Sequence, residues 1–85
     1  MKKISRMAFI LISFPKGSHS LLETFSLISK YEPLFLGSIN VTIPDSKESI
    51  FGILVKANTD QLGAITGSLG KITGVKVKSA VLPDK

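Results

Sequence analysis

Two segments of the chain carry hydrophobic residues on both faces of a predicted strand. The first covers residues 4–14, where the two-residue period separates two apolar sets: Ala8, Ile10, Ile12 and Phe14 against Met7, Phe9 and Leu11. The second covers residues 49–56, where Ile50 and Leu54 lie on one face and Phe51, Ile53 and Val55 lie on the other. A strand that is apolar on both faces is typical of a sheet covered on both sides. We therefore expect these two strands to be central.

The stretch from Asp60 to Lys78 predicts a helix that is followed by a strand. Apolar residues recur in it at helical spacing and form one stripe: Leu62, Ile65, Leu69 and Ile72. Side chains that favour helix caps stand just before the stripe, at Asn58, Thr59 and Asp60. Gly74 is the expected end of the helix, because helix ends often need a left-handed residue. Residues 75–82 then alternate like a half-buried edge strand, with lysines at 76 and 78.

An earlier helix is expected to begin near Ser20. Ser20 and Glu23 have the spacing of a capping box, and Ser18 is an alternative cap. The expected buried stripe consists of Leu21, Leu22, Phe25 and Ile28. The side chains expected to face away are Glu23, Thr24 and Lys30. Pro33 should end the helix, with a non-helical Glu32 before it.

The remaining elements complete a β-α-β-β-α-β order. Residues 34–43 predict a strand in which Gly37 marks a bulge, and the polar residues 44–47 predict a short hairpin connection to the next strand. Right-handed crossovers then place the first and third strands in the centre and both helices on one face. The predicted fold class is α+β: one ferredoxin-like domain over residues 1–85, with a four-stranded antiparallel sheet.

Three glycines form a second stripe on the helix that follows Asp60. They are Gly63, Gly67 and Gly70. Each costs roughly 1 kcal/mol relative to alanine inside a helix, so a compensating contact is expected. Two interpretations stay open: close packing of this helix on the sheet or on another helix, and a backbone that is approached by a ligand or a partner subunit.

The hydrophobic content exceeds what one copy of this small domain should need. The chain has 85 residues, of which 44% are hydrophobic, and its mean hydropathy is +0.33. Two helices on one face leave the other face of the sheet, with residues such as Met7, Phe9 and Leu11, exposed in a monomer. We expect a second subunit to cover it, in a homo-oligomer that is a dimer or a tetramer.

Charge and cysteine content exclude several classes of partner. The net charge is +5, but the positive residues are scattered or terminal, which argues against a nucleic-acid interface. The chain has no cysteine, hence no disulfide framework, and we expect a cytoplasmic location. The apolar run after Lys2, Lys3 and Arg6 resembles a secretory signal, but it is short, lacks a small-residue cleavage site and cannot span a membrane.

No catalytic set can be assembled from the sequence. No Ser-His-Asp or Cys-His spacing is present, and the glycines do not match a phosphate-binding loop. The single histidine, His19, lies at a helix start, where a solvated or capping side chain is the ordinary interpretation and ligand binding or proton transfer the alternative. We therefore predict no enzyme activity, no cofactor and no metal site.

Residues 58–79, NTDQLGAITGSLGKITGVKVKS, resemble the C-terminal half of a family of iron-only hydrogenase system regulators. The family signature is close to L-[ST]-G-x-L-G-x-x-x-G-V-x-V-K-[ST], and the matching positions here are Ile65, Thr66, Gly67, Leu69, Gly70, Gly74, Val75, Val77, Lys78 and Ser79. The family is ACT-like and related in fold to the regulatory domain of nickel-responsive repressors. Its Arg-x-Gly-x-Pro segment at the end of the second strand is replaced here by residues 37–41, GSINV.

The resemblance implies a non-enzymatic regulatory domain that oligomerises and binds a small anionic or amino-acid-like effector between subunits. The expected effector contacts are Pro15, Gly17, Ser18, Asn58, Thr59, Asp60, Gly63 and Gly67. Backbone N–H groups at helix starts favour carboxylates, although helix caps and packing glycines would explain the same residues without a ligand. The nickel-binding relatives use His and Cys ligands, and because this chain has only His19 and no cysteine, we do not expect their metal site here. The alternative function is a structural or protein-interaction module without a ligand.

Overall fold

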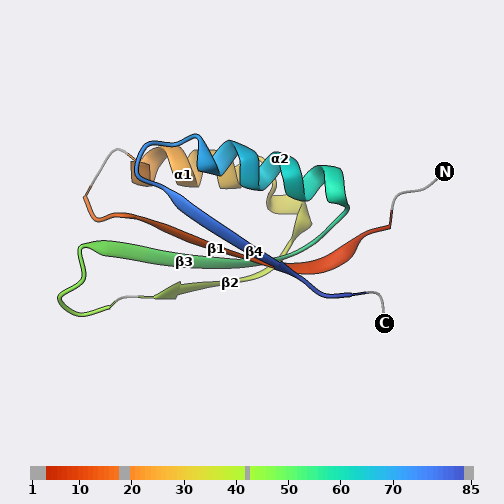
Figure 1. Ribbon diagram of the computed structural model, residues 1–85, viewed down its shortest axis with the longest axis horizontal. Coiled ribbons are helices and arrows are strands. Elements are labelled where there is room, and N and C mark those ends of the chain that lie inside the picture. The colour runs from red at the N-terminus through yellow and green to blue at the C-terminus, as the bar shows by residue number, and fades with distance from the viewer. Residues whose placement is uncertain (1–3, 18–19, 42, 84–85) are drawn as a thin grey trace.

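The computed structural model describes residues 4–17, 20–41 and 43–83. Its elements in chain order are β1 (Arg6–Pro15), α1 (Ser20–Ser29), the 3-10 helix η1 (Glu32–Leu34), β2 (Phe35–Val41), β3 (Glu48–Ala57), α2 (Thr59–Gly70) and β4 (Lys76–Val81). The strands form one antiparallel sheet in the order β2-β3-β1-β4. Both helices lie on the same face of this sheet (Figure 1). The ferredoxin-like α+β fold is confirmed, with β1 and β3 in the centre.

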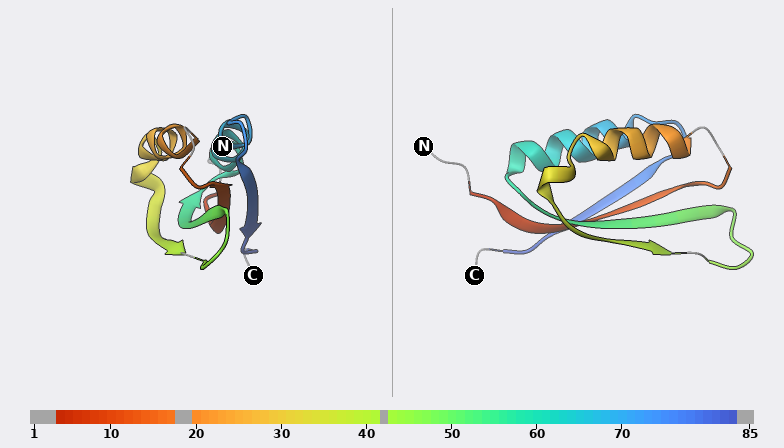
Figure 2. Two further views of the ribbon diagram at one scale, coloured as in Figure 1. Left: turned by 90° about the vertical axis from the view of Figure 1, so that its left-hand side faces the viewer. Right: turned by 180° about the vertical axis from the view of Figure 1, so that it is seen from behind.

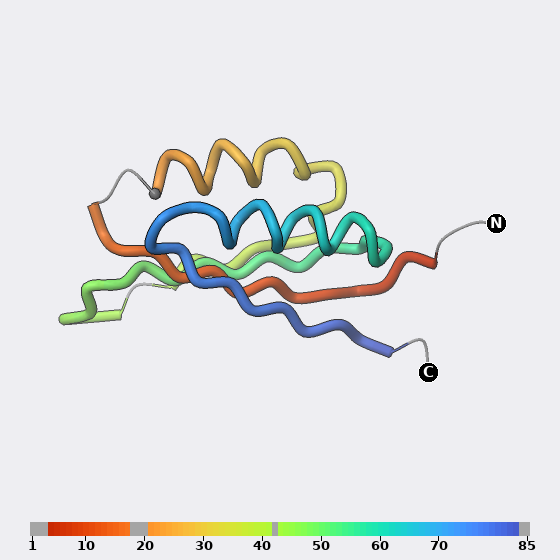
Figure 3. The backbone as a smooth tube through the Cα atoms, turned by 45° about the horizontal axis from the view of Figure 1, so that its top comes forward, coloured from red at the N-terminus to blue at the C-terminus, as the bar shows by residue number. Residues whose placement is uncertain are grey.

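The helices divide the sheet between them. Seen end-on, α1 lies above the side of the sheet that ends in β2, and α2 lies above the side that ends in β4 (Figure 2). The two helices run in opposite directions, as the tube drawing shows (Figure 3). The molecule is long and narrow, with extents of 46 × 22 × 18 Å. We call the sheet face that carries the helices the inner face and the other the outer face.

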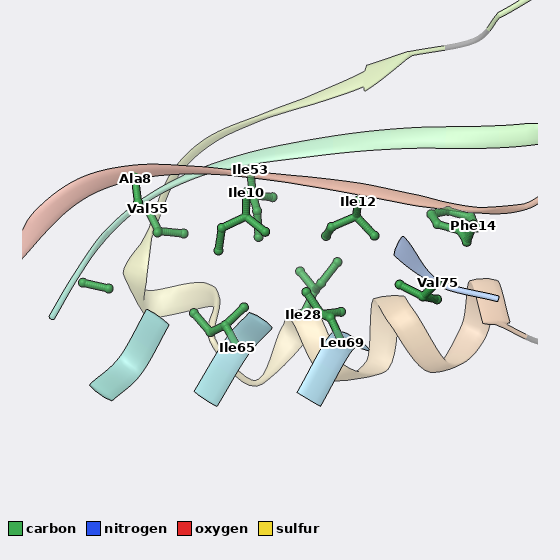
Figure 4. Close-up of a cluster of buried hydrophobic side chains, with 11 residues drawn as sticks. Ala8, Ile10, Ile12, Phe14, Ile28, Ile53, Val55, Ile65, Leu69 and Val75 are labelled. Carbon is green, nitrogen blue, oxygen red and sulfur yellow. The ribbon is translucent and has the colours of Figure 1, made fainter. Parts of the chain in front are cut away.

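The core lies between the inner face and the helices (Figure 4). Its buried members are Ala8, Ile10, Ile12, Phe14, Ile28, Ile53, Val55, Ala57, Ile65, Leu69 and Val75. The even-numbered residues of β1 and the odd-numbered residues of β3 therefore point inward, and each set is one of the two that the two-residue period separated. The predicted stripe of α2 is also confirmed, with Ile65 and Leu69 buried and Leu62 and Ile72 packed at the margin of the core.

The buried stripe predicted for α1 is wrong in register. Leu22 is 72% exposed, whereas Thr24, which was expected to face away, is completely buried. The helix is rotated so that a line from Leu21 through Thr24 to Ile28 faces the sheet, and Leu27, not Leu22, packs against the core beside it. Phe25 stays at the boundary, where its ring makes an edge contact with Phe14, at 6.2 Å between centroids.

The segment between α1 and β2 also departs from the prediction at one point. α1 ends at Ser29, and Glu32, expected to be non-helical, begins the 3-10 helix η1 instead. Pro33 fits there because the first turn of a helix does not need its N–H. The bulge predicted at Gly37 is confirmed, since the pairing of β2 with β3 shifts between Phe35 and Gly37.

Asn58 is the N-cap of α2, as predicted. Its side-chain oxygen accepts a hydrogen bond from the Gln61 N–H at 2.8 Å, and the Gln61 side chain accepts one from the Asn58 N–H at 2.9 Å. This reciprocal pair satisfies two N–H groups that the helix itself leaves unbonded. The helix ends at Gly70, so the prediction that Gly74 terminates it is wrong. Gly74, at φ 82°, instead turns the chain into β4.

Candidate functional site

The first two turns of α2 border a surface hollow of about 320 Å³ that contains two of the predicted effector residues, Thr59 and Gly63. The hollow lies between α2, the start of β1 and the end of β4. Its lining is Ile4, Arg6, Ala57, Thr59, Leu62, Gly63, Thr66, Ser79 and Val81. Three hydroxyl groups and one guanidinium group therefore stand among apolar side chains, and such a set can bind a small anionic molecule through charge-assisted hydrogen bonds.

The glycine stripe of α2 does not pack against any of the described residues outside its own helix. All three glycines, Gly63, Gly67 and Gly70, are exposed. A Cβ added at any of them would have no atom of the described residues within 4 Å, if the neighbouring residues and the nearby backbone of the same helix are set aside. The opposite flank of α2 is the one that faces α1, because Ser68 and Ile72 border a second hollow together with α1 side chains. Intramolecular close packing is thus the wrong explanation, and contact with a ligand or partner stays a prediction.

The two groups of predicted effector residues lie at opposite ends of β1. Arg6, at one end, pairs with Ala57, which directly precedes the cap of α2. Pro15, at the other, pairs with Glu48, and a strand of this length spans roughly 30 Å. Gly17, two residues after Pro15, has φ 71° and lies at the same end of β1. One copy of the chain therefore does not bring the two groups together.

Of the remaining predicted positions, Asn58, Asp60 and Gly67 lie near the hollow without lining it. Ser18, like His19, falls outside the described residues. Contact of any of these residues with an effector stays a prediction.

The outer face of the sheet is apolar along its centre, as expected. Phe9 lies beside Leu54 on the neighbouring strand, and Leu11 is 42% exposed. Two apolar hollows, of about 260 and 360 Å³, flank Phe9 and share Leu54. The first extends over the end of β4, and the second reaches β2 at Ile39, which is 55% exposed. Phe9 therefore stands as a ridge between two depressions.

Sequence reasoning missed a polar cluster at one end of the outer face. The Glu48 carboxylate accepts a hydrogen bond from the Ser13 hydroxyl at 3.2 Å and lies 3.6 Å from the Lys76 ammonium. Three strands contribute one residue each, so only the strand order could have revealed the cluster. Because Lys76 is largely exposed, its ion pair with Glu48 adds little to the stability of the fold. Its main effect is that the two opposite charges offset each other at this end of the outer face.

Within the described part of the chain, no three side chains of His, Cys, Asp or Glu lie close enough together to hold a metal ion. None of the helices in the same residues has the length and apolar character that crossing a bilayer requires.

Comparison with solved structures defines the class of fold. The protein TM1266 from Thermotoga maritima, described as uncharacterized, superposes with a TM-score of 0.88 at 23% identity, over 93% of this chain and 99% of that one. The ACT domain of a GTP pyrophosphokinase from Chlorobium tepidum gives 0.74 at 19% identity, over 89% and 99%. SnoaB, a cofactor-independent oxygenase from Streptomyces nogalater, gives 0.54 at 13%, over 95% and 94%. The fold is ACT-like.

Comparison with family models defines the family. The TM1266-like family model, described as "Iron-only hydrogenase system regulator, putative", matches residues 6–79. Since the match spans most of the chain, this protein belongs to that family. A search of curated proteins finds no match.

Proposed function

We propose that this chain is a non-enzymatic regulatory domain that assembles with copies of itself and binds a small effector where the copies meet. Membership of a family described as regulators and the ACT-like fold support the regulatory role. The observation that carries the assembly is the apolar outer face, which both helices leave uncovered.

The energetic case for assembly follows from the outer face. Burying about 600 Å² of apolar surface per subunit would contribute on the order of 15 kcal/mol before the costs of association. Phe9, standing between its two hollows, gives this surface a relief that another protein surface can match. A second copy carries the same Phe9 side chain and the same hollows. In a twofold arrangement, Phe9 of each copy can therefore pack into a hollow of the other copy.

The proposed effector is a small anionic or amino-acid-like molecule at the start of α2. Thr59 and Gly63 border the hollow there, and Arg6 contributes its positive charge. The first N–H groups of a helix lack partners within the helix and attract anions. Gly63 lets such a molecule approach the backbone closely, because no side chain stands in the way. A carboxylate therefore fits the chemistry of this hollow.

Thermal unfolding with a panel of amino acids and small carboxylates tests effector binding. A ligand present at 100 times its dissociation constant should stabilise the fold by about 2.7 kcal/mol. For a domain of this size that corresponds to a rise in Tm of roughly 10 °C or more. Gly63→Leu should abolish the response by filling the hollow, whereas the matched change Ala64→Leu, at an exposed neighbouring position, should preserve it. A response that survives Gly63→Leu would contradict this location.

A structural or protein-interaction module without a ligand is the second candidate. The two hollows beside Phe9 favour it, because their lining is almost wholly apolar and suits side chains of another protein better than a polar metabolite. This alternative predicts assembly in the absence of any ligand and no change of Tm across the panel.

A further inference from the structure

The two helices have a side that faces away from the sheet, and no described element covers it (Figure 2). A hollow of about 390 Å³ lies between the helices there. Its lining is Leu22, Glu23, Ser26, Leu27, Lys30, Ser68 and Ile72. Leu22 is 72% exposed, the largest exposed fraction among the large hydrophobic side chains of the described residues. Leu22 and the hollow beside it together are a candidate contact for another protein surface.

Two opposite charges lie on the uncovered side of α1, about two helical turns apart. Glu23 and Lys30 are separated by seven residues, or roughly 10 Å along a helix axis, and both line the hollow. Lys30 directly follows α1 and continues its last turn, since its N–H donates to the Leu27 carbonyl at 3.1 Å. Ser26 lies between the two charges. Neither charged side chain has an ion-pair partner within the described part of the chain.

We propose that α1 of a second copy packs against α1 across this hollow, in the opposite direction, about a twofold axis at the level of Ser26 and Leu27. The charges decide the occupant, because Glu23 and Lys30 lie at equal distances from that axis along the helix. Glu23 therefore faces the partner's Lys30, and Lys30 faces the partner's Glu23. A helix of unrelated sequence would match this pattern only by chance, whereas a second copy always carries it. We call this arrangement the α1 contact.

The side chains near the axis fit a close contact between helices. Packed helices lie about 8–10 Å apart, and the small side chain of Ser26 permits the closer values. Leu22 of each copy then lies beside the carbon chain of the partner's Lys30, whose ammonium group can stay in water. Leu27 and Ile72, which pack at the margin of the core, form the apolar floor of the hollow. The contact thus covers Leu22 and gives both charges a partner.

The charges set the direction and register of the α1 contact more than its strength. A parallel pair of helices would place Glu23 beside the partner's Glu23 and Lys30 beside the partner's Lys30, and like charges at an interface are strongly unfavourable. Opposite charges at an exposed contact add little affinity by themselves. Two helices per copy also bury less area than a standard protein interface. We therefore expect a weak contact that forms as the concentration rises.

The α1 contact uses neither the outer face nor the hollow at the start of α2, and it does not rest on the function proposed above. It stacks helix layer against helix layer and leaves both sheets on the outside. The helix layer and the outer face are opposite sides of the molecule (Figure 1). The α1 contact can therefore join outer-face dimers into larger assemblies, which makes the state of the protein depend on its concentration.

Sedimentation equilibrium of charge-reversal variants tests the α1 contact. All chains carry Phe9→Asp, so that the outer face does not contribute to association. This parent chain should dimerise at high micromolar concentration. Adding Glu23→Lys or Lys30→Glu sets like charges opposite each other twice and should weaken association by at least about tenfold. An equal mixture of the two variants restores two pairs of opposite charges and should dimerise as the parent does.

The mixture excludes an indirect effect of the substitutions on the helix. Each reversal removes a favourable charge from one end of α1, but mixing two folded variants changes neither helix. Lys47→Glu, at an exposed position before β3, makes the same change of charge as Lys30→Glu and should not rescue Glu23→Lys. A parent that stays monomeric, single variants that associate as the parent does, or a mixture that stays monomeric would overturn the α1 contact. Each leaves the outer-face assembly standing, because that is measured on the chain with Phe9 intact.

Cross-linking locates the contact independently. The chain has no cysteine, so Ser26→Cys and Lys47→Cys each introduce a single thiol. Two thiols at position 26 lie on either side of the proposed axis, within the separation of packed helices, and a short bismaleimide should join them at least about tenfold faster than two thiols at position 47. Equal rates of cross-linking for the two variants would overturn the proposal.

Discussion

The phenyl ring of Phe9 covers the backbone of Gly52 on the outer face of the sheet. The two residues belong to adjacent central strands, and a Cβ at residue 52 would overlap the far end of the ring. Gly52 is buried as a result. The position and tilt of Phe9, and with them the two hollows at its sides, therefore depend on the missing side chain of its neighbour.

Gly52→Ala should displace Phe9 and weaken assembly while the fold persists. Overpacking typically costs 1–3 kcal/mol, and the lower part of this range is expected here because the ring can swing into solvent. In a Phe9→Ala background the same change should cost much less, since the clash is gone. Urea unfolding of the two single variants and the double variant measures this coupling. Additive costs would show that Phe9 does not constrain residue 52.

Thr24→Val should stabilise the protein. The Thr24 hydroxyl is completely buried and has no hydrogen-bond partner in the described part of the chain. An unsatisfied buried polar group costs about 1–3 kcal/mol, and valine replaces the hydroxyl with a methyl group of similar shape. Thr24→Ser, which keeps the hydroxyl and loses the methyl group, should destabilise it. Chemical denaturation compares both with the unaltered chain, and a loss of stability in the valine variant would contradict the assignment.

Two glycines with equally open surroundings should respond to alanine in opposite directions. Gly67 lies in a helix, and Gly67→Ala should raise the free energy of unfolding of one copy by up to about 1 kcal/mol. Gly17 has φ 71°, and Gly17→Ala should lower it by about the same amount because alanine is strained there. Denaturation at concentrations that dissociate any oligomer separates this effect from assembly. A stabilising Gly17→Ala would refute the strain argument.

Asn58→Ala should shorten or loosen the start of α2. The change removes the acceptor for the Gln61 N–H and the reciprocal arrangement of the capping box, at a cost of about 1 kcal/mol. Asn58→Asp keeps an acceptor oxygen and should cost little. The unfolding free energies of both variants and the exchange rate of the Gln61 amide check this expectation. An Asn58→Ala variant as stable as the unaltered chain would show that the cap contributes nothing.

The sequence determined the sheet more fully than the helices. β1 and β3 could be placed in the centre because each is apolar on both faces. A period of two separates the residues of each strand into two sets, but only the structure shows that the sets of Ile10 and Ile53 face the helices. α1 was harder, since Leu22 and Leu27 lie on opposite sides of the stripe through Leu21 and Ile28, and the apolar pattern alone does not decide which of them packs against the core. In the structure the helix is oriented so that Thr24 is buried. This orientation depends on the shape of the core and not on local hydrophobicity.

The candidate site was predictable residue by residue but not as an arrangement. Asn58 could be identified as a cap from its type and position, and Gly63 and Gly67 as unusual positions in a helix. Their distance from Pro15 follows from the length of β1, which separates the start of α1 from the start of α2. The contacts of Glu48 with Ser13 and Lys76 required the register of three strands.

The central claim is that a second copy covers the outer face around Phe9, and sedimentation equilibrium tests it most directly. At micromolar concentration the unaltered chain should sediment at two or four times its 9.1 kDa mass, and Phe9→Asp should lower that mass by placing a charge in the apolar contact. A 9.1 kDa species in the unaltered chain, or an unchanged mass in a folded Phe9→Asp variant, would contradict the claim.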